Sequence, residues 1–222
     1  VVVVEKFGYG FSDDWSNHRD LDTILSQTRK ALQKADVKGP YVLLPHSMSG
    51  LEAMHWSASY PKEVEAIIGL DMSFPQAYDN YRPNQLLYKT LQLAANLGLS
   101  RWFYSPDKEI RSLSNGSLNP KEKSIYKALF YRRPLSNAII KEAEEVKRNA
   151  KLVKQDKVTA IPYLLFVSNG QGTGFARKDW QDMSKDFAKD HKNVQLKSFD
   201  VPHYIHSYIP DELAKEIRKF LE

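Results

Sequence analysis

Short apolar runs alternate with amphipathic stretches along much of the chain. Three runs in the first part are nearly continuous in apolar residues, the pattern of strands buried on both faces of a sheet: residues 1–4, 41–44 and 64–70. Between them, apolar residues recur every three or four positions, which predicts helices over 21–35 and 49–60. Strands that alternate with helices predict an α/β fold, with a doubly wound and mostly parallel sheet.

The alternation stops after Asp71. Residues 72–160 hold no convincing buried strand but three helix-like stretches, at 86–99, 120–130 and 137–154. Because this segment is too long for a loop, it predicts a helical cap inserted between two strands. Strands return at 161–167 and 194–199, with one helix between them and one after them. The predicted organisation is a first core part (1–71), a cap (72–160) and a second core part (161–222).

The first cap helix has an apolar face, formed by Leu86, Leu87, Leu91, Leu93 and Ala94. We expect this face to pack on the core, and the alternative is that it lines an acyl-binding pocket. The cap holds no excess of aromatic residues, so the sequence gives no reason to expect an aromatic substrate.

The most informative stretch, residues 41–50, reads YVLLPHSMSG. A buried strand runs into a short turn and then a helix, the setting of the sharp G-x-S-x-G turn that presents a nucleophilic serine. Ser47 is the predicted nucleophile, and the backbone N–H of Met48 is the predicted oxyanion donor at the positive end of the helix. Ser49 and Gly50 supply the small residues that follow, whereas Pro45 replaces the usual glycine. The alternative is a serine that only caps a helix.

A serine hydroxyl needs a neighbouring base, and histidine suits this task near neutral pH. The candidates are His203 and His206, in the loop after the last strand; we favour His203 and keep His206 as the alternative. His46 is expected to face away from the base that partners the hydroxyl, as a packing residue or as one that contacts a residue of the site. His55, inside a helix, is expected to be structural.

The base needs a carboxylate to orient it. The usual place is the loop after the next-to-last strand, but residues 168–175 (SNGQGTGF) contain no acid. Asp71, at the end of the third strand, is the predicted acid and gives the chain order Ser, Asp, His. Asp179 is the alternative, and a site without either acid stays open.

Composition narrows the functional classes. The chain has 222 residues and no Cys, which excludes disulfides and Cys-based zinc sites, and no apolar run is long enough to span a bilayer. The net charge is +5, but residues 121–157 hold 11 Lys and Arg against 5 Asp and Glu. A solvated helix face is the first interpretation, and a surface for anionic lipid or an anionic substrate is the second. No motif supports nucleic-acid binding or establishes a membrane contact, and the oligomeric state is open.

Three motifs in order give the chain a family resemblance. Residues 7–13 (FGYGFSD), the elbow at 45–50 and residues 201–206 (VPHYIH) resemble the α/β-hydrolase superfamily, and more narrowly the capped esterase- and lipase-like serine hydrolases of Gram-positive bacteria. The resemblance implies a serine hydrolase that cleaves a carboxylic ester or related acyl bond through Ser47, Asp71 and His203, without metal or organic cofactor. Related acyltransferases, prolyl aminopeptidases and C–C bond hydrolases stay open, whereas relatives with an Asp nucleophile fit Ser47 poorly. A non-catalytic binding protein of the same fold is the alternative.

The resemblance also predicts strands before Val1. In this fold three strands precede the predicted first one, and the loop after the third supplies a second oxyanion N–H. We therefore expect an N-terminally incomplete sequence that is poorly stable by itself. An export signal or anchor would lie in the preceding part, so the compartment is left open, with the cytoplasm as the default.

Overall fold

The computed structural model describes residues 1–15, 18–103, 105–132, 135–157 and 159–222. It divides into two compact units, residues 1–24 with 82–146 and residues 25–81 with 147–222. These units do not coincide with the division at residues 71 and 160 expected from the sequence, which stays a prediction. Each unit is described separately below.

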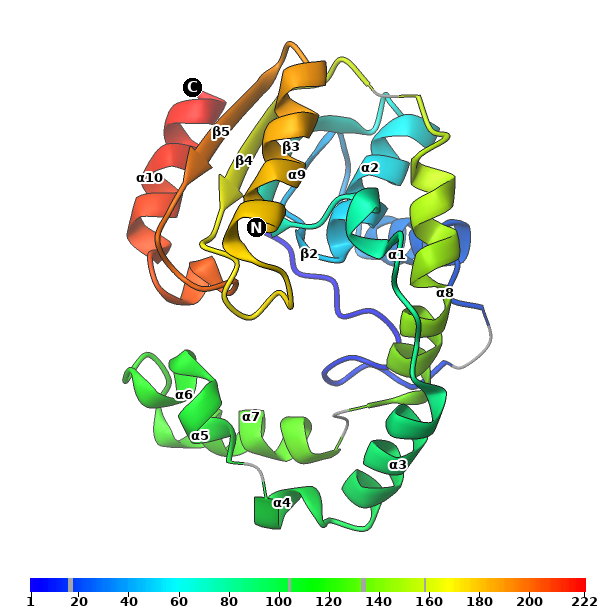
Figure 1. Cartoon of the computed structure of the whole chain (residues 1–222), viewed down its shortest axis with the longest axis vertical. Helices are drawn as coiled ribbons and strands as arrows, with labels where there is room; N and C mark the ends of the chain where they lie inside the picture. The colour runs from blue at the N-terminus through cyan, green and yellow to red at the C-terminus, as the bar shows by residue number, and fades with distance from the viewer. Residues whose placement is uncertain (16–17, 104, 133–134, 158) are drawn as a thin grey trace. The chain divides into compact units, whose positions relative to one another are not determined.

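The second unit is built on a parallel sheet (Figure 1). Its strands follow the order β1 (Tyr41–Leu43), β3 (Val64–Met72), β4 (Tyr163–Val167) and β5 (Val194–Ser198), and the short β2 (His46–Ser47) pairs with the end of β3. The register places Ile67 beside Tyr163 and Leu70 beside Phe166. All paired strands are parallel, as predicted.

Alternate residues of β4 face different helices, so the sheet is covered on both sides. Leu164 and Phe166 belong to a buried cluster with Leu213 of α10 (Pro210–Leu221). Tyr163 faces the other way and meets Phe187 of α9 (Arg177–Asp190) with ring centroids 5.2 Å apart. Every residue of β4 is buried, which explains its unbroken apolar sequence.

The remaining elements of this unit connect the strands. Helix α2 (Ser49–Ser59) follows the elbow, η1 (Pro75–Tyr78) follows β3, and η2 (Ile205–Ser207) precedes α10. Helices α1 (Leu21–Lys34) and α8 (Asn137–Val153) run from one unit into the other along the chain. The predicted helices at 21–35, 49–60 and 137–154 therefore exist, with ends one residue earlier.

The first unit contains five further helices among the described residues: α3 (Gln85–Asn96), α4 (Ser100–Phe103), α5 (Pro106–Glu109), α6 (Arg111–Ser114) and α7 (Pro120–Arg132). Its buried polar centre is Glu142, whose carboxylate accepts hydrogen bonds from Arg19 (2.6 Å) and Lys6 (2.9 Å). Burial opposes ionisation of this carboxyl, but the two cations outweigh it and lower the pKa of Glu142.

The strand expected at the start of the chain is absent from the structure. Residues 1–4 form no strand, and Val1, Val2 and Val3 are exposed; a strand needs a neighbour for its backbone groups, and no strand in the described part pairs with them. In α3, the side chains of Leu86, Leu87, Leu91 and Leu93 are exposed, and the expected packing of this face on the core, which lies in the other unit, stays a prediction. Periodicity identifies an apolar face without identifying what covers it.

Candidate active site

The predicted nucleophile lies on a tight turn between β2 and α2. Ser47 has φ +54°, in the left-handed region that costs a non-glycine residue about 1–3 kcal/mol. The backbone carbonyl of Ser47 accepts two hydrogen bonds from Ser73, one from the backbone N–H (2.9 Å) and one from the side-chain hydroxyl of Ser73 (3.1 Å). These contacts with the segment after β3 hold the turn in its strained conformation.

Local side chains explain why this turn forms without the usual glycines. The hydroxyl of Ser49 donates to the backbone carbonyl of His46 (2.6 Å) and accepts from the backbone N–H of His46 (3.0 Å). The side chain of Ser49 therefore stabilises the turn. Gly50 is required for space, since a Cβ there would lie 2.6 Å from the carbonyl oxygen of Ser73. Pro45 is buried, and its carbonyl accepts from Leu70 (2.8 Å).

The backbone N–H of Met48 is the predicted oxyanion donor. Met48 directly precedes α2, so its N–H belongs to the group of amides that an α-helix leaves unpaired at its start. No hydrogen bond among the described contacts uses it. The position suits the binding of a developing negative charge, because the helix dipole is positive at this end.

The predicted base and acid meet directly. The Nδ1 atom of His203 lies 2.6 Å from Oδ2 of Asp71, and both residues are buried. The other carboxylate oxygen of Asp71 accepts from the N–H of Ser168 (2.7 Å) and from the indole Nε1–H of Trp180 (2.9 Å). The carboxylate is thus fixed by three donors, with Nδ1–H of His203 as the third.

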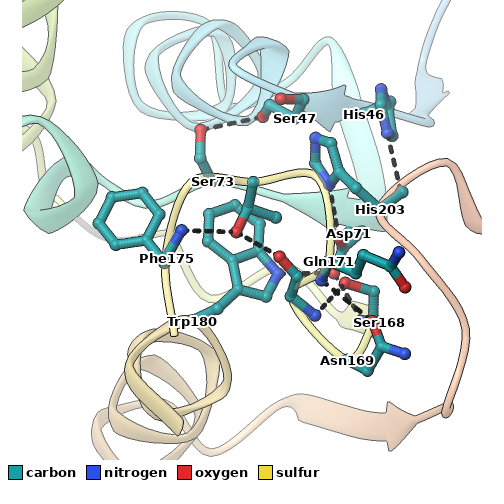
Figure 2. A network of polar contacts seen from close by, with 12 residues as sticks. His46, Ser47, Asp71, Ser73, Ser168, Asn169, Gln171, Phe175, Trp180 and His203 are labelled. Atoms are coloured by element: carbon teal, nitrogen blue, oxygen red, sulfur yellow. Dashed lines mark hydrogen bonds and ion pairs between the residues drawn. The ribbon is translucent and has the colours of Figure 1, made fainter. Parts of the chain in front are cut away.

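Figure 2 shows how these groups lie around the histidine: in this view, the ring of His203 lies between Ser47 and Asp71. All three come from the carboxyl ends of strands or the loops that follow them, the edge where open parallel sheets place their sites. No described hydrogen bond joins the Ser47 hydroxyl to the ring. Catalytic hydrogen bonds are often long without substrate, so this geometry is compatible with proton transfer.

Comparisons with known proteins agree with this architecture. No protein-family model matches the chain. Over 229 residues the chain is 32% identical to the uncharacterized protein YbdG of Bacillus subtilis (strain 168), covering 100% of this chain and 70% of YbdG. Epoxide hydrolase VrEH1 from Vigna radiata has the same fold, with TM-score 0.70 at 14% identity over 97% of this chain and 79% of that chain.

A thermophilic esterase from Thermogutta terrifontis matches with TM-score 0.64 at 15% identity, over 97% of this chain and 77% of that one. The chain has the α/β-hydrolase fold. The 32% identity over the full chain shows that the protein belongs to the same family as YbdG. At 14–15% identity the two solved structures establish the fold alone.

The position of Asp71, and not of an acid after β4, beside His203 has a simple structural reason. Ser168 directly follows β4, in the loop that is the usual place of the acid, and its N–H binds the carboxylate of Asp71. Because β3 and β4 are neighbours in parallel register, side chains at either strand end reach the same space. Asp179, the alternative, is exposed in the first turn of α9 and has no described contact with His203.

Two contacts were missed by the sequence analysis. Trp180 belongs to none of the motifs described from the sequence, and its indole N–H binds the acid of the site. Ser168 was noted only for not being an acid. Both residues donate a hydrogen bond to Asp71, which is 97 and 109 residues away in the sequence. A motif of neighbouring residues therefore could not reveal either contact.

His46 contacts the predicted base and does not face away from it, so its expected direction is wrong, whereas its expected role as a residue that packs beside the site agrees with the structure. Its ring centroid lies 4.5 Å from that of His203, and its Nε2 lies 3.2 Å from the backbone carbonyl of His203. His206, the alternative base, packs edge-on against His46 at 5.0 Å. Burial, together with repulsion by the ring of His203, lowers the pKa of His46 to about 4. His46 therefore stays neutral and donates Nε2–H to His203.

This pKa predicts a pH-dependent loss of stability. An unfolded histidine titrates near pH 6.5 and folded His46 near 4, so the unfolded chain binds more protons between these values. Above about pH 6.5 the neutral His46 does not lower the free energy of unfolding. As the pH falls below this value the free energy of unfolding decreases, and the loss reaches about 2.5 kcal/mol at about pH 4.5. Replacement of His46 by glutamine, which retains a donor, should remove this loss. Urea unfolding of both proteins near pH 7 and pH 4.5 measures it; equal losses would contradict the assignment.

His55, like His203, forms a hydrogen bond with a carboxylate among the described contacts. It is buried within α2, as expected for a residue inside this helix, and its Nδ1 lies 2.8 Å from the carboxylate of Asp156. Across the described residues, no group of three or more His, Asp or Glu side chains is arranged to hold a metal ion.

Proposed function

We propose that this protein is a serine hydrolase that cleaves carboxylic esters through an acyl-enzyme on Ser47. The observation that carries the proposal is the 2.6 Å contact between Nδ1 of His203 and the anchored carboxylate of Asp71. This contact leaves Nε2 as the free nitrogen of the ring, because the proton on Nδ1 is directed to the acid. Nε2 is then the atom that takes the proton of Ser47.

The reaction follows from these positions. The Oγ atom of Ser47 attacks the ester carbonyl while Nε2 of His203 removes its proton, and the oxyanion forms beside the N–H of Met48. Collapse of the tetrahedral intermediate breaks the ester C–O bond, and His203 protonates the departing alcohol. Water then attacks the acyl-enzyme with His203 again as base, which releases the carboxylic acid and restores Ser47.

Asp71 orients and stabilises the charged histidine during both steps. It can do so because its carboxylate is held by Ser168 and Trp180 and has no freedom to rotate towards another partner. The proposed role thus makes Trp180 a positioning residue. The contact between Asp71 and His203 supports the hydrolase over a non-catalytic binding protein, the alternative that the missing acid after β4 and the replacement of glycine by Pro45 favour.

Two measurements test the proposal together. A fluorophosphonate probe should label the folded protein on Ser47, as identified by mass spectrometry of the modified peptide, and heat-denatured protein should remain unlabelled. A series of p-nitrophenyl esters from short to long acyl chains should be hydrolysed, and the profile would define the acyl pocket. A folded protein that is neither labelled nor active would favour the non-catalytic alternative.

A further inference from the structure

Helix α3 and the short α4 leave large apolar side chains in contact with solvent. Of the twelve residues of α3, Ala95 alone is buried among those described. The exposed fractions are 79% for Leu86, 59% for Leu93 and 65% for the following Leu97, and Trp102 of α4 is 80% exposed. This apolar surface belongs to the unit of residues 1–24 and 82–146, whereas Ser47, Asp71 and His203 belong to the other unit.

The exposed leucines form one continuous face. Leu86, Leu93 and Leu97 are separated by seven and four residues, the spacing of one side of an α-helix. Leu87 and Leu91 are also exposed, and widen this face. Contiguous apolar surface of this kind on a soluble domain marks a site of contact with a partner or a membrane. We call this surface, Leu86 to Trp102, the leucine face.

Charge identifies the kind of partner. Residues 82–133 contain ten Lys and Arg against three Asp and Glu, a net charge of +7, whereas the whole chain carries +5. Lys89 in α3 and Arg101 in α4 are exposed on the elements that carry the leucine face. One of the three acids, Asp107, pairs with Lys127 at 2.7 Å, and the net charge of +7 already includes both residues. The surroundings of the leucine face are therefore strongly cationic.

We propose that the leucine face binds the surface of an anionic lipid bilayer. Leucine side chains and an exposed tryptophan insert into the boundary between headgroups and acyl chains, and Lys89 and Arg101 contact the lipid phosphates. No described helix is long and apolar enough to cross a membrane. The proposal stands apart from the chemistry of Ser47.

A bilayer fits this surface better than a second copy of the chain. Two leucine faces brought together would also bring together two segments of +7, and like charges at an interface oppose association. An anionic bilayer satisfies the cations and the apolar residues at once, and membrane binding normally needs both contributions.

Co-sedimentation with vesicles tests the proposal. The protein should bind phosphatidylcholine vesicles that contain phosphatidylserine and should bind pure phosphatidylcholine far more weakly. The variant Leu93→Gln/Leu97→Gln should bind about tenfold more weakly per leucine. Loss of two cations in Lys89→Gln/Arg101→Gln should weaken binding about 25-fold, or about fivefold per charge. The matched control Lys30→Gln/Lys34→Gln removes two exposed lysines from α1 and should bind normally.

Tryptophan fluorescence gives a second readout that needs no change in the leucines. Emission should shift to the blue when vesicles are added, and the shift should be lost in Trp102→Phe but kept in Trp15→Phe, which alters another exposed tryptophan.

Three results would overturn the proposal. The first is absence of binding to the phosphatidylserine vesicles. The second is self-association that the leucine changes abolish, which would make the face an interface between copies. The third is a raised KM for a soluble ester in the leucine variant without vesicle binding, which would make the face part of the substrate pocket.

Discussion

Replacement of Ser47 by alanine is expected to lower kcat for a p-nitrophenyl ester by at least about 10³-fold, because the nucleophile of the proposed acyl-enzyme is removed. KM should change little, since the hydroxyl contributes mainly to the reaction and not to binding. The turn should survive: the contacts that hold Ser47 use its backbone carbonyl. Urea unfolding of the variant should therefore match that of the unchanged protein.

The chain provides its own control for this prediction. Ser59, His55 and Asp156 form a second sequence of serine, histidine and acid, with Ser59 Oγ 3.5 Å from Nε2 of His55 and Nδ1 of His55 2.8 Å from Asp156. By residue type alone, either serine could be the nucleophile. The variant Ser59→Ala should nevertheless keep kcat within about twofold, as expected for a surface substitution away from the chemistry.

Helix polarity decides between the two serines. Ser47 stands before the start of α2, where unpaired amides and the positive helix end stabilise an oxyanion. Ser59 is the last residue of the same helix, where unpaired carbonyls and the negative end would repel one. A large loss of kcat in Ser59→Ala, with Ser47→Ala still active, would contradict the proposed site.

Much of the candidate site is encoded locally and could be predicted. The strand, turn and helix around Ser47 lie within ten residues, and the order of strands places His203 at the same edge of the sheet. Asp71 could be proposed because strand ends meet there, even without an acid after β4. These predictions required only element boundaries and sheet direction, which hydrophobic periodicity indicates well.

The missed contacts depend on side-chain directions that periodicity does not specify. The indole N–H of Trp180 reaches Asp71 across 109 residues of sequence. The direction of His46 follows from the turn at Ser47, whose positive φ is a tertiary feature. The same limit applies to apolar segments: residues 1–4 and the face of α3 have the right composition for burial, but burial also requires a neighbour.

Replacement of Asp71 by asparagine is expected to lower kcat by about 10⁴-fold while the fold remains intact. Asparagine has the same shape, and its carbonyl oxygen can still accept from Ser168 and Trp180. Its NH₂ group would then face Nδ1 of His203 and donate to it. This forces the proton of the ring onto Nε2, so that His203 can no longer accept the proton of Ser47. Ester hydrolysis and the rate of fluorophosphonate labelling should fall together.

The matched variant Asp179→Asn separates the two candidate acids. Asp179 is exposed on α9, so its loss should leave kcat within about twofold. Comparable losses in both variants would instead indicate that total charge, and not the contact with His203, sets the rate.

The double variant Asp71→Asn/Ser168→Asp tests the geometry further. If either strand end can serve the histidine, moving the carboxylate from β3 to β4 should recover part of the activity, because the N–H of Ser168 already lies 2.7 Å from Oδ1 of Asp71.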